Sequence, residues 1–169
     1  METCPECGFD YGLLGRDRLG DELVSGGREV ARALTEGAAD ALRRRDVPER
    51  WSALEYACHV RDVLSVQHAR TLAALVSTTP VFASMRREEL VSERRYAESD
   101  PVVVAAEVLD AAAALAAVWA DLRSDQWVRE GIYNFPQVQA RSIDWIARHT
   151  VHEVIHHLRD IEGSRTARG

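Results

Sequence analysis

The sequence predicts an all-α domain of four long helices. Apolar residues recur at helical spacing in four stretches, at residues 21–45, 52–76, 100–123 and 142–161. Clear N-cap signals precede three of these stretches, and no linker divides the 169 residues. With 46% hydrophobic residues, a chain of this length can bury one core.

Composition and charge exclude several classes of function. The formal net charge of -6 argues against a nucleic-acid partner, which usually needs a basic face. No apolar run approaches the roughly 20 residues that span a bilayer, and the first residues do not resemble a signal peptide. We therefore expect a cytoplasmic protein without a membrane partner. None of the 21 basic residues is lysine, which excludes Schiff-base and P-loop chemistry.

Residues 1–20 form a short extension that we expect to pack on the bundle of residues 21–169. The extension contains Cys4-Pro5-Glu6-Cys7-Gly8, which has the shape of one zinc knuckle. A structural zinc site needs four ligands, and the third cysteine, Cys58, lies far away in the sequence. Three interpretations stay open: a structural zinc site at Cys4 and Cys7 completed by histidine or carboxylate, a redox-active dithiol, or cysteines that only cap the fold.

The first predicted helix covers residues 21–45 and follows an irregular, glycine-rich stretch at residues 12–20. Three glycines make its start and middle less certain, namely Gly26, Gly27 and Gly37. The sequence Asp46-Val47-Pro48 ends this helix, because the residue before a proline disfavours helical backbone angles.

The second predicted helix has the clearest start. Ser52 and Glu55 have the spacing of a capping box, and Trp51 and Tyr56 are placed for a hydrophobic staple across it. His59 lies at the margin of the apolar face. A histidine in such a position is more often a hydrogen-bonded structural residue than a metal ligand, unless other ligands meet it.

Residues 77–99 are predicted to form a long connection with at most one short helix. Connections of this length often pass over a functional site. Five of its residues are candidate contacts to an anionic substrate, although a solvated charged surface is the alternative: Arg86, Arg87, Arg94, Arg95 and Tyr96.

The third predicted helix starts at Asp100-Pro101, with Asp as N-cap and Pro at the first helical position. It is mostly alanine, which allows close helix packing and would also suit a homodimer interface. Residues 124–141 then predict an aromatic-rich loop or irregular hairpin, with Trp127, Tyr133, Phe135 and Pro136.

The last predicted helix carries four of the six histidines, all between His149 and His157. Histidine is neither a strong helix former nor a usual core residue, so packing does not explain this density. Metal binding does, because imidazole and carboxylate are common ligands and residues four apart share a helix face.

A helical wheel separates these histidines into two groups. His152 and His156 lie almost opposite the apolar stripe, which predicts a solvated polar face for them. Glu153 and His157 lie on its flank, and ligands of a metal inside a bundle must point inward. We therefore predict Glu153 and His157 as the ligands. The apolar stripe consists of Ala147, Val151, Val154, Leu158 and Ile161.

Two motifs resemble the DinB-like metal-binding four-helix bundles, a superfamily that includes mycothiol-dependent maleylpyruvate isomerases and bacillithiol S-transferase-like proteins. Trp51-Ser52-Ala53-Leu54-Glu55-Tyr56-Ala57-Cys58-His59 is similar to the start of the family's second helix. His156-His157-Leu158-Arg159-Asp160-Ile161 is similar to the end of its last helix. The resemblance covers about residues 21–162 and implies a down-up-down-up bundle.

The resemblance also implies the metal ligands and a chemistry. It makes His59, Glu153 and His157 the ligands of a divalent metal, most naturally zinc. It implies a thiol-dependent S-transferase, in which the metal activates a small thiol such as mycothiol toward an electrophile, and a possible homodimer. The alternatives are a metal-dependent hydrolase and a non-enzymatic metal-binding or stress-related module. Cys4 and Cys7 lie outside the family pattern.

Overall fold

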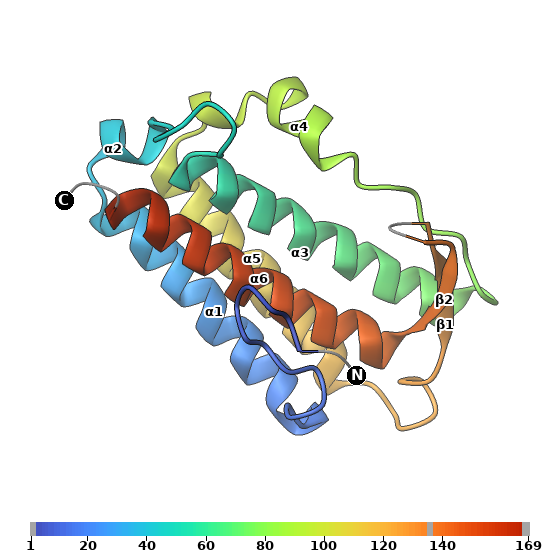
Figure 1. The fold of residues 1–169 in the computed structure, drawn as a ribbon. Coiled ribbons are helices and arrows are strands. Elements are labelled where there is room, and N and C mark those ends of the chain that lie inside the picture. Colours follow the sequence, from blue (N-terminus) through green and yellow to red (C-terminus); the bar gives the residue numbers. More distant parts are fainter. Residues whose placement is uncertain (1–2, 135–136, 167–169) are drawn as a thin grey trace.

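Four long helices form a four-helix bundle in the structure, a computed structural model that describes residues 3–134 and 137–166 (Figure 1). They are α1 (Arg16–Glu36), α3 (Ala53–Val76), α5 (Pro101–Ala120) and α6 (Ile143–Thr166). Both α1 and α3 pack against α5 and against α6, so α1 and α3 lie on one diagonal of the bundle. The predicted all-α four-helix bundle is confirmed.

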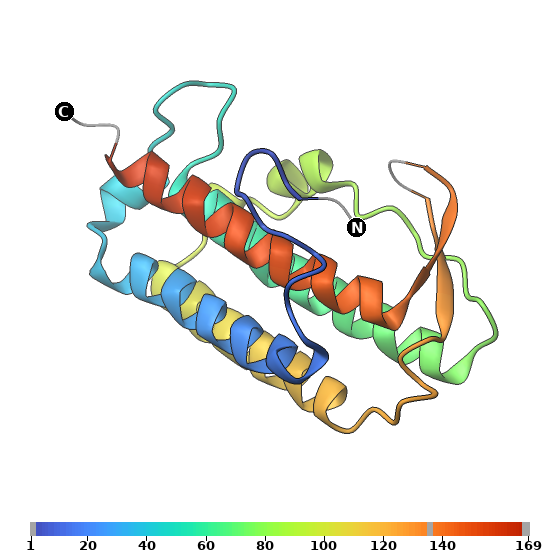
Figure 2. The same ribbon diagram turned by 60° about the horizontal axis from the view of Figure 1, so that its bottom comes forward.

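The helix directions differ from the predicted down-up-down-up order. Helices α3 and α5 run the same way, and α1 and α6 run the opposite way (Figures 1 and 2). Near the start of α3, the thiol of Cys58 lies 3.9 Å from the carbonyl oxygen of Tyr96, just before α5. Beyond the end of α5, Arg129 Nε donates to the carbonyl oxygen of Ala74 at 2.5 Å. The long connection between the two helices therefore returns along the length of the bundle.

Shorter elements complete the ends of the bundle. The long connection contains the predicted short helix, α4 (Arg87–Glu93), followed by a single 3-10 turn, η1 (Tyr96–Glu98). Between α5 and α6, the predicted irregular hairpin is confirmed as an antiparallel pair, β1 (Glu130–Tyr133) and β2 (Gln139–Ser142). Of its four predicted aromatic and proline residues, Phe135 and Pro136 lie outside the described residues.

The first helix starts earlier and ends earlier than predicted. It begins at Arg16, within the stretch predicted to be irregular, and the residues after Gly37 form a separate short helix, α2 (Ala39–Arg43). A Cβ atom at Gly37 would lie 2.7 Å from Leu42 Cδ2, so the glycine lets α2 fold back closely. Helix α1 continues through Gly26, and α6 packs closely against it at this point. A Cβ atom at Gly26 would lie only 2.8 Å from Val154 Cγ1.

This close crossing leads to a stability prediction. Gly26→Ala should lower the free energy of unfolding by about 1–2 kcal/mol, because overpacking against Val154 outweighs the gain in helix propensity. Gly20→Ala is the matched control on the same helix, since its Cβ would meet Ala116 Cβ at an ordinary 3.6 Å. That control should raise the stability by up to about 1 kcal/mol. Urea unfolding measures both changes, and equal effects from the two variants would contradict the prediction.

The start of α3 agrees with the sequence. Glu55 N donates to Ser52 Oγ at 3.3 Å, and Ser52 N donates to Glu55 Oε2 at 2.8 Å, which confirms the capping box. The rings of Trp51 and Tyr56 pack with centroids 5.4 Å apart. Because the helix starts at a defined residue, the position of His59 two turns later is also defined.

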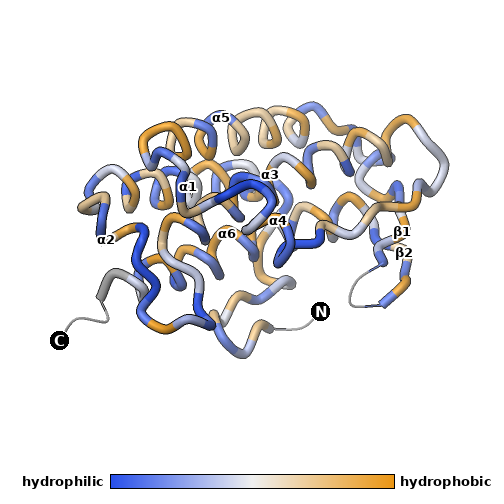
Figure 3. The backbone as a smooth tube through the Cα atoms, turned by 90° about the horizontal axis from the view of Figure 1, so that it is seen from above, coloured by the Kyte–Doolittle hydropathy of each residue, from blue (hydrophilic) through white to orange (hydrophobic). Residues whose placement is uncertain are grey.

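Helix α5 is long and apolar enough to cross a membrane by length and composition alone. The expectation that no apolar run approaches such a length is therefore wrong on this criterion. The fold gives the apolar character another explanation, because Val104, Val108 and Leu115 are buried against the neighbouring helices. Figure 3 shows apolar colouring along most of α5.

Candidate metal centre

The three residues predicted as metal ligands meet between α3 and α6. One ligand atom each from His59, Glu153 and His157 lie within 4.8 Å of one another. The rings of His59 and His157 meet edge to face, with centroids 4.8 Å apart. Both histidines are buried. The structure thus brings the predicted set together, while metal binding by it stays a prediction.

An unpartnered nitrogen atom of His59 indicates that this donor set can bind a divalent metal. Among the described residues, the buried Nδ1 atom of His59 has no hydrogen-bond partner. An unpartnered polar atom in a protein interior is costly, so a ligand to this histidine is expected. Two imidazoles and one carboxylate are the N/O donors that divalent transition metals such as zinc bind.

Asp160 orients the second imidazole. Its Oδ2 atom lies 2.8 Å from His157 Nδ1, which turns Nε2 toward Glu153 Oε2 at 3.7 Å. A carboxylate behind a ligating histidine fixes its tautomer and ring orientation. This role of Asp160 was missed, although its spacing three residues after His157 places both on one helix face.

The protonation states follow from burial and from these contacts. Burial, followed by the nearby charge of His157, lowers the pKa of His59 to about 4, so this ring is neutral at pH 7. Burial alone would raise the pKa of Glu153, but the rings of His152 and His157 outweigh it and hold that pKa well below its usual range. Burial opposes the charge on His157, yet the hydrogen bonds with Asp160 and Glu153 raise its pKa to about 9.

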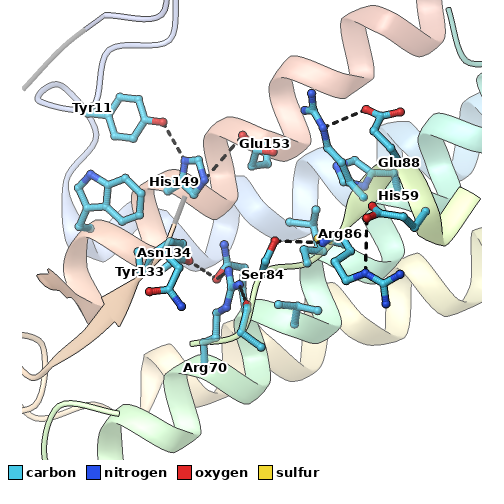
Figure 4. A pocket seen from close by; sticks show the side chains of 18 residues that line it. Tyr11, His59, Arg70, Ser84, Arg86, Glu88, Tyr133, Asn134, His149 and Glu153 are labelled. Carbon is cyan, nitrogen blue, oxygen red and sulfur yellow. Dashed lines mark hydrogen bonds and ion pairs between the residues drawn. The ribbon is translucent and has the colours of Figure 1, made fainter. Parts of the chain in front are cut away.

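A cavity of about 520 Å³ adjoins the donor set, and His59 and Glu153 form part of its wall (Figure 4). The wall combines segments far apart in the sequence. Helices α3 and α6 form two sides, the start of α4 forms a third, and the N-terminal extension and the β1 strand contribute Tyr11 and Tyr133. A cavity of this size can hold a small organic substrate.

The α3 side of the cavity is formed by one face of that helix. Val63, Gln67 and Arg70 follow His59 at intervals of four, eight and eleven residues, so all four share one helix face. Arg70 donates to the carbonyl oxygen of Ala83 at 2.7 Å, and its guanidinium lies 4.6 Å from the centroid of the Tyr133 ring. Sequence reasoning missed Gln67 and Arg70, although counting from His59 along the helix would have found them.

The candidate substrate contacts of the long connection divide into two groups. Arg86 and Arg87 line the cavity. Arg94 and Tyr96 instead bind the buried carboxylate of Asp62 on α3, at 2.8 and 2.6 Å. The fifth candidate, Arg95, pairs on the surface with a neighbouring glutamate and does not line the cavity.

The remaining histidines of α6 face the N-terminal extension. His149 Nδ1 lies 3.1 Å from the Tyr11 hydroxyl, and Nε2 lies 3.9 Å from Glu153 Oε1. The expectation of a solvated face for His152 and His156 is wrong, because the extension crosses α6 and covers them (Figure 2). The helical wheel correctly placed both histidines opposite the apolar stripe, but it carries no information about where the N-terminal extension lies.

The cysteines occupy two separate places. Cys4 and Cys7 lie against His152 and His156, in a group whose ligand atoms are within 4.8 Å of one another. Backbone N–H groups of the knuckle point at the Cys4 sulfur, and the hydrogen bond from Cys7 is the main cause that lowers the pKa of the Cys4 thiol to about 6. Cys58 is buried on α3 beside Tyr96, outside this group, and burial raises the pKa of its thiol.

The sequence of the bundle agrees with one known family. The profile described as DinB superfamily matches residues 23–161. The chain belongs to the DinB superfamily. Comparison with curated protein sequences gives no significant match.

Two solved structures share the DinB fold seen here. YfiT from Bacillus subtilis, described as a probable metal-dependent hydrolase with an unusual four-helix bundle topology, superposes with a TM-score of 0.82 at 15% identity, covering 88% of this chain and 85% of YfiT. The mycothiol-dependent maleylpyruvate isomerase superposes with a TM-score of 0.72 at 16% identity. That match covers 90% of this chain but 63% of the isomerase. At these identities the similarity establishes the fold.

Proposed function

We propose that this DinB-superfamily protein is a metal-dependent S-transferase that joins a small thiol, such as mycothiol, to an electrophile. His59, Glu153 and His157 would hold a divalent ion, with zinc as the preferred metal. One observation carries the proposal: His59 and Glu153 are part of the wall of a 520 Å³ cavity. Structural zinc sites are closed by four protein ligands, whereas catalytic sites have three and keep one position open to substrate.

The chain's own residues prepare this donor set. A bound divalent ion lowers the pKa of a coordinated thiol, which makes thiolate available near neutral pH. Glu153 contributes a negative charge that partly balances such an ion, and His59 is neutral and needs no deprotonation to act as a ligand. Asp160 holds His157 in position. The proposal includes a cytoplasmic location, where small thiols are kept reduced.

The cavity wall supports an anionic group on the electrophile. The guanidinium of Arg70 is fixed by Ala83 and by the Tyr133 ring, so little side-chain entropy is lost when it binds a carboxylate. Arg86 and Arg87 also line the cavity, but each is paired with a glutamate of α4, so Arg70 is the cation that carries this inference. The wall therefore favours an electrophile that carries a carboxylate.

Metal-dependent hydrolysis is the second candidate, and one observation favours it. His149 lies in the cavity wall beside Glu153, and burial lowers its pKa, so its ring is neutral at pH 7 and can accept a proton from water. The similarity of YfiT, described as a probable metal-dependent hydrolase, supports the same candidate. The similarity of the mycothiol-dependent isomerase supports thiol transfer.

An assay with zinc-loaded protein separates these functions. Consumption of chlorodinitrobenzene should accelerate when mycothiol is added, beyond the uncatalysed thiol reaction, and chelation should abolish the enzymatic part. Parallel reactions contain either bacillithiol in place of mycothiol or no thiol. Equal turnover with and without thiol would contradict the transferase. Metal-dependent cleavage of a carboxylate-bearing ester without thiol would favour the hydrolase, and inactivity in both assays would favour a metal-binding module.

A further inference from the structure

Four potential ligands outside the candidate metal centre converge where the N-terminal extension crosses α6. Ligand atoms of Cys4, Cys7, His152 and His156 lie within 4.8 Å of one another. Cys4 Sγ and His156 Nδ1 are 3.8 Å apart. Zinc bond lengths in a tetrahedral site imply ligand separations of about 3.3–3.8 Å, so adjustments of about 1 Å would complete such a site.

The spacing of the two cysteines and the spacing of the two histidines both agree with a zinc site. The cysteines are separated by two residues, and the histidines by three, which are common spacings for paired zinc ligands. His152 and His156 are four residues apart on α6, so their side chains project from one helix face. The two halves of the set come from opposite ends of the chain, which explains why a second Cys-x-x-Cys is not needed.

The backbone of the extension is shaped as a knuckle around the cysteines. Gly8 N donates to the carbonyl oxygen of Cys4 at 2.8 Å, and Cys4 N donates to that of Phe9 at 2.8 Å. Gly8 has a φ of 75°, a conformation that glycine adopts without strain. A further hydrogen bond, from Arg159 to the carbonyl oxygen of Glu6 at 2.7 Å, holds this turn on α6.

His152 provides the observation that packing does not explain. Both of its ring nitrogens are buried, and neither has a hydrogen-bond partner among residues 3–134 and 137–166. Its Nδ1 lies 3.3 Å from Glu153 Oε1 but without the alignment of a hydrogen bond. Unpartnered buried nitrogens beside two thiols are expected of a metal ligand. A redox-active dithiol would account for the cysteines but not for the two histidines.

From these observations we infer a second, structural zinc site formed by Cys4, Cys7, His152 and His156. Binding takes both cysteines as thiolates and leaves a closed set of four protein ligands, in contrast to the open three-ligand set beside the cavity. The site fastens the extension across α6. It thereby holds Tyr11, which lines the cavity and contacts His149 at 3.1 Å, against the candidate metal centre.

Cobalt substitution tests this site in the intact protein without any mutation. Cobalt bound by two cysteines gives thiolate-to-metal charge-transfer absorption, which the His59, Glu153 and His157 set cannot produce. We expect this absorption in the wild-type protein and its loss in Cys4→Ser. Its absence from fully cobalt-loaded wild-type protein, or recovery of Cys4 and Cys7 as a disulfide under reducing conditions, would overturn the inference.

Metal counting on purified zinc-loaded variants gives the second readout. The wild type should hold two equivalents, and Cys7→Ser and His152→Ala should each hold one. Cys58→Ser and His68→Ala are matched controls outside the group and should keep two. His59→Ala should lose one equivalent but retain the cobalt–thiolate absorption, so failure of either site is recognised separately. An unchanged count of two in both Cys7→Ser and His152→Ala would overturn the inference.

Discussion

His59→Ala should abolish metal binding at the candidate metal centre and remove about one equivalent of zinc from the purified protein. The variant keeps two donors, and both belong to a single helix, so the metal loses its connection to α3. A metal bound only by the folded state stabilises it by about 4 kcal/mol when its free concentration is 1,000 times Kd. This metal-dependent stabilisation, measured as the difference in Tm with and without zinc, should be smaller in the variant than in the wild type, and the part that remains belongs to the second zinc site.

Matched variants identify the cause of that loss. His157→Ala should have the same effect, whereas Asp160→Asn should weaken metal affinity by roughly 10–100-fold because it disturbs only the orientation of His157. His68→Ala is the control on the same helix, since His68 belongs to no potential metal-binding group among the described residues. Thiol transfer should fall in parallel with metal content. Full metal retention in both His59→Ala and His157→Ala would show that the proposed ligands are wrong.

Helical spacing explains why the sequence was informative about α6. Positions on one helix have fixed angular relations, so Glu153 and His157 could be placed on the flank of the apolar stripe before their neighbours were known. Their convergence with His59 required a resemblance to known bundles, because local spacing cannot say which helices pack together. The same limit explains why the parallel arrangement of α3 and α5 was not foreseen.

The N-terminal extension shows where local patterns stop being informative. Residues 3–14 have no helical or strand periodicity, and their contacts join positions far apart in sequence, such as Tyr11 with His149. The pattern Cys-Pro-x-Cys-Gly predicted half of a zinc site, and the wheel separated His152 and His156 from the core. Neither observation alone connected the two halves, because nothing in the local sequence records that the extension crosses α6.

Asp62→Ala should have the largest effect on stability among substitutions away from the metal ligands. Its buried carboxylate accepts hydrogen bonds from Tyr96, Arg94 and Arg61, at 2.6, 2.8 and 2.8 Å. Removal leaves the fully buried Tyr96 hydroxyl without its partner and Arg94 without the carboxylate it pairs with, while Arg61 retains only its ion pair with Glu107. Breaking a buried charged network costs about 3–5 kcal/mol, and the partial exposure of Arg94 places the expected loss at about 3 kcal/mol.

The consequence for function follows from what this network holds. Tyr96 and Arg94 belong to the long connection, and α4 within the same connection forms one side of the cavity through Arg86 and Arg87. Loss of Asp62 should therefore lower Tm by roughly 6–12 °C and raise the KM of the electrophile, while zinc content stays unchanged. Asp125→Ala, which removes an exposed surface pair, should change stability by less than about 0.5 kcal/mol. Equal stability of the two variants would show that the connection is held by its other contacts, and that the cavity wall does not depend on this carboxylate.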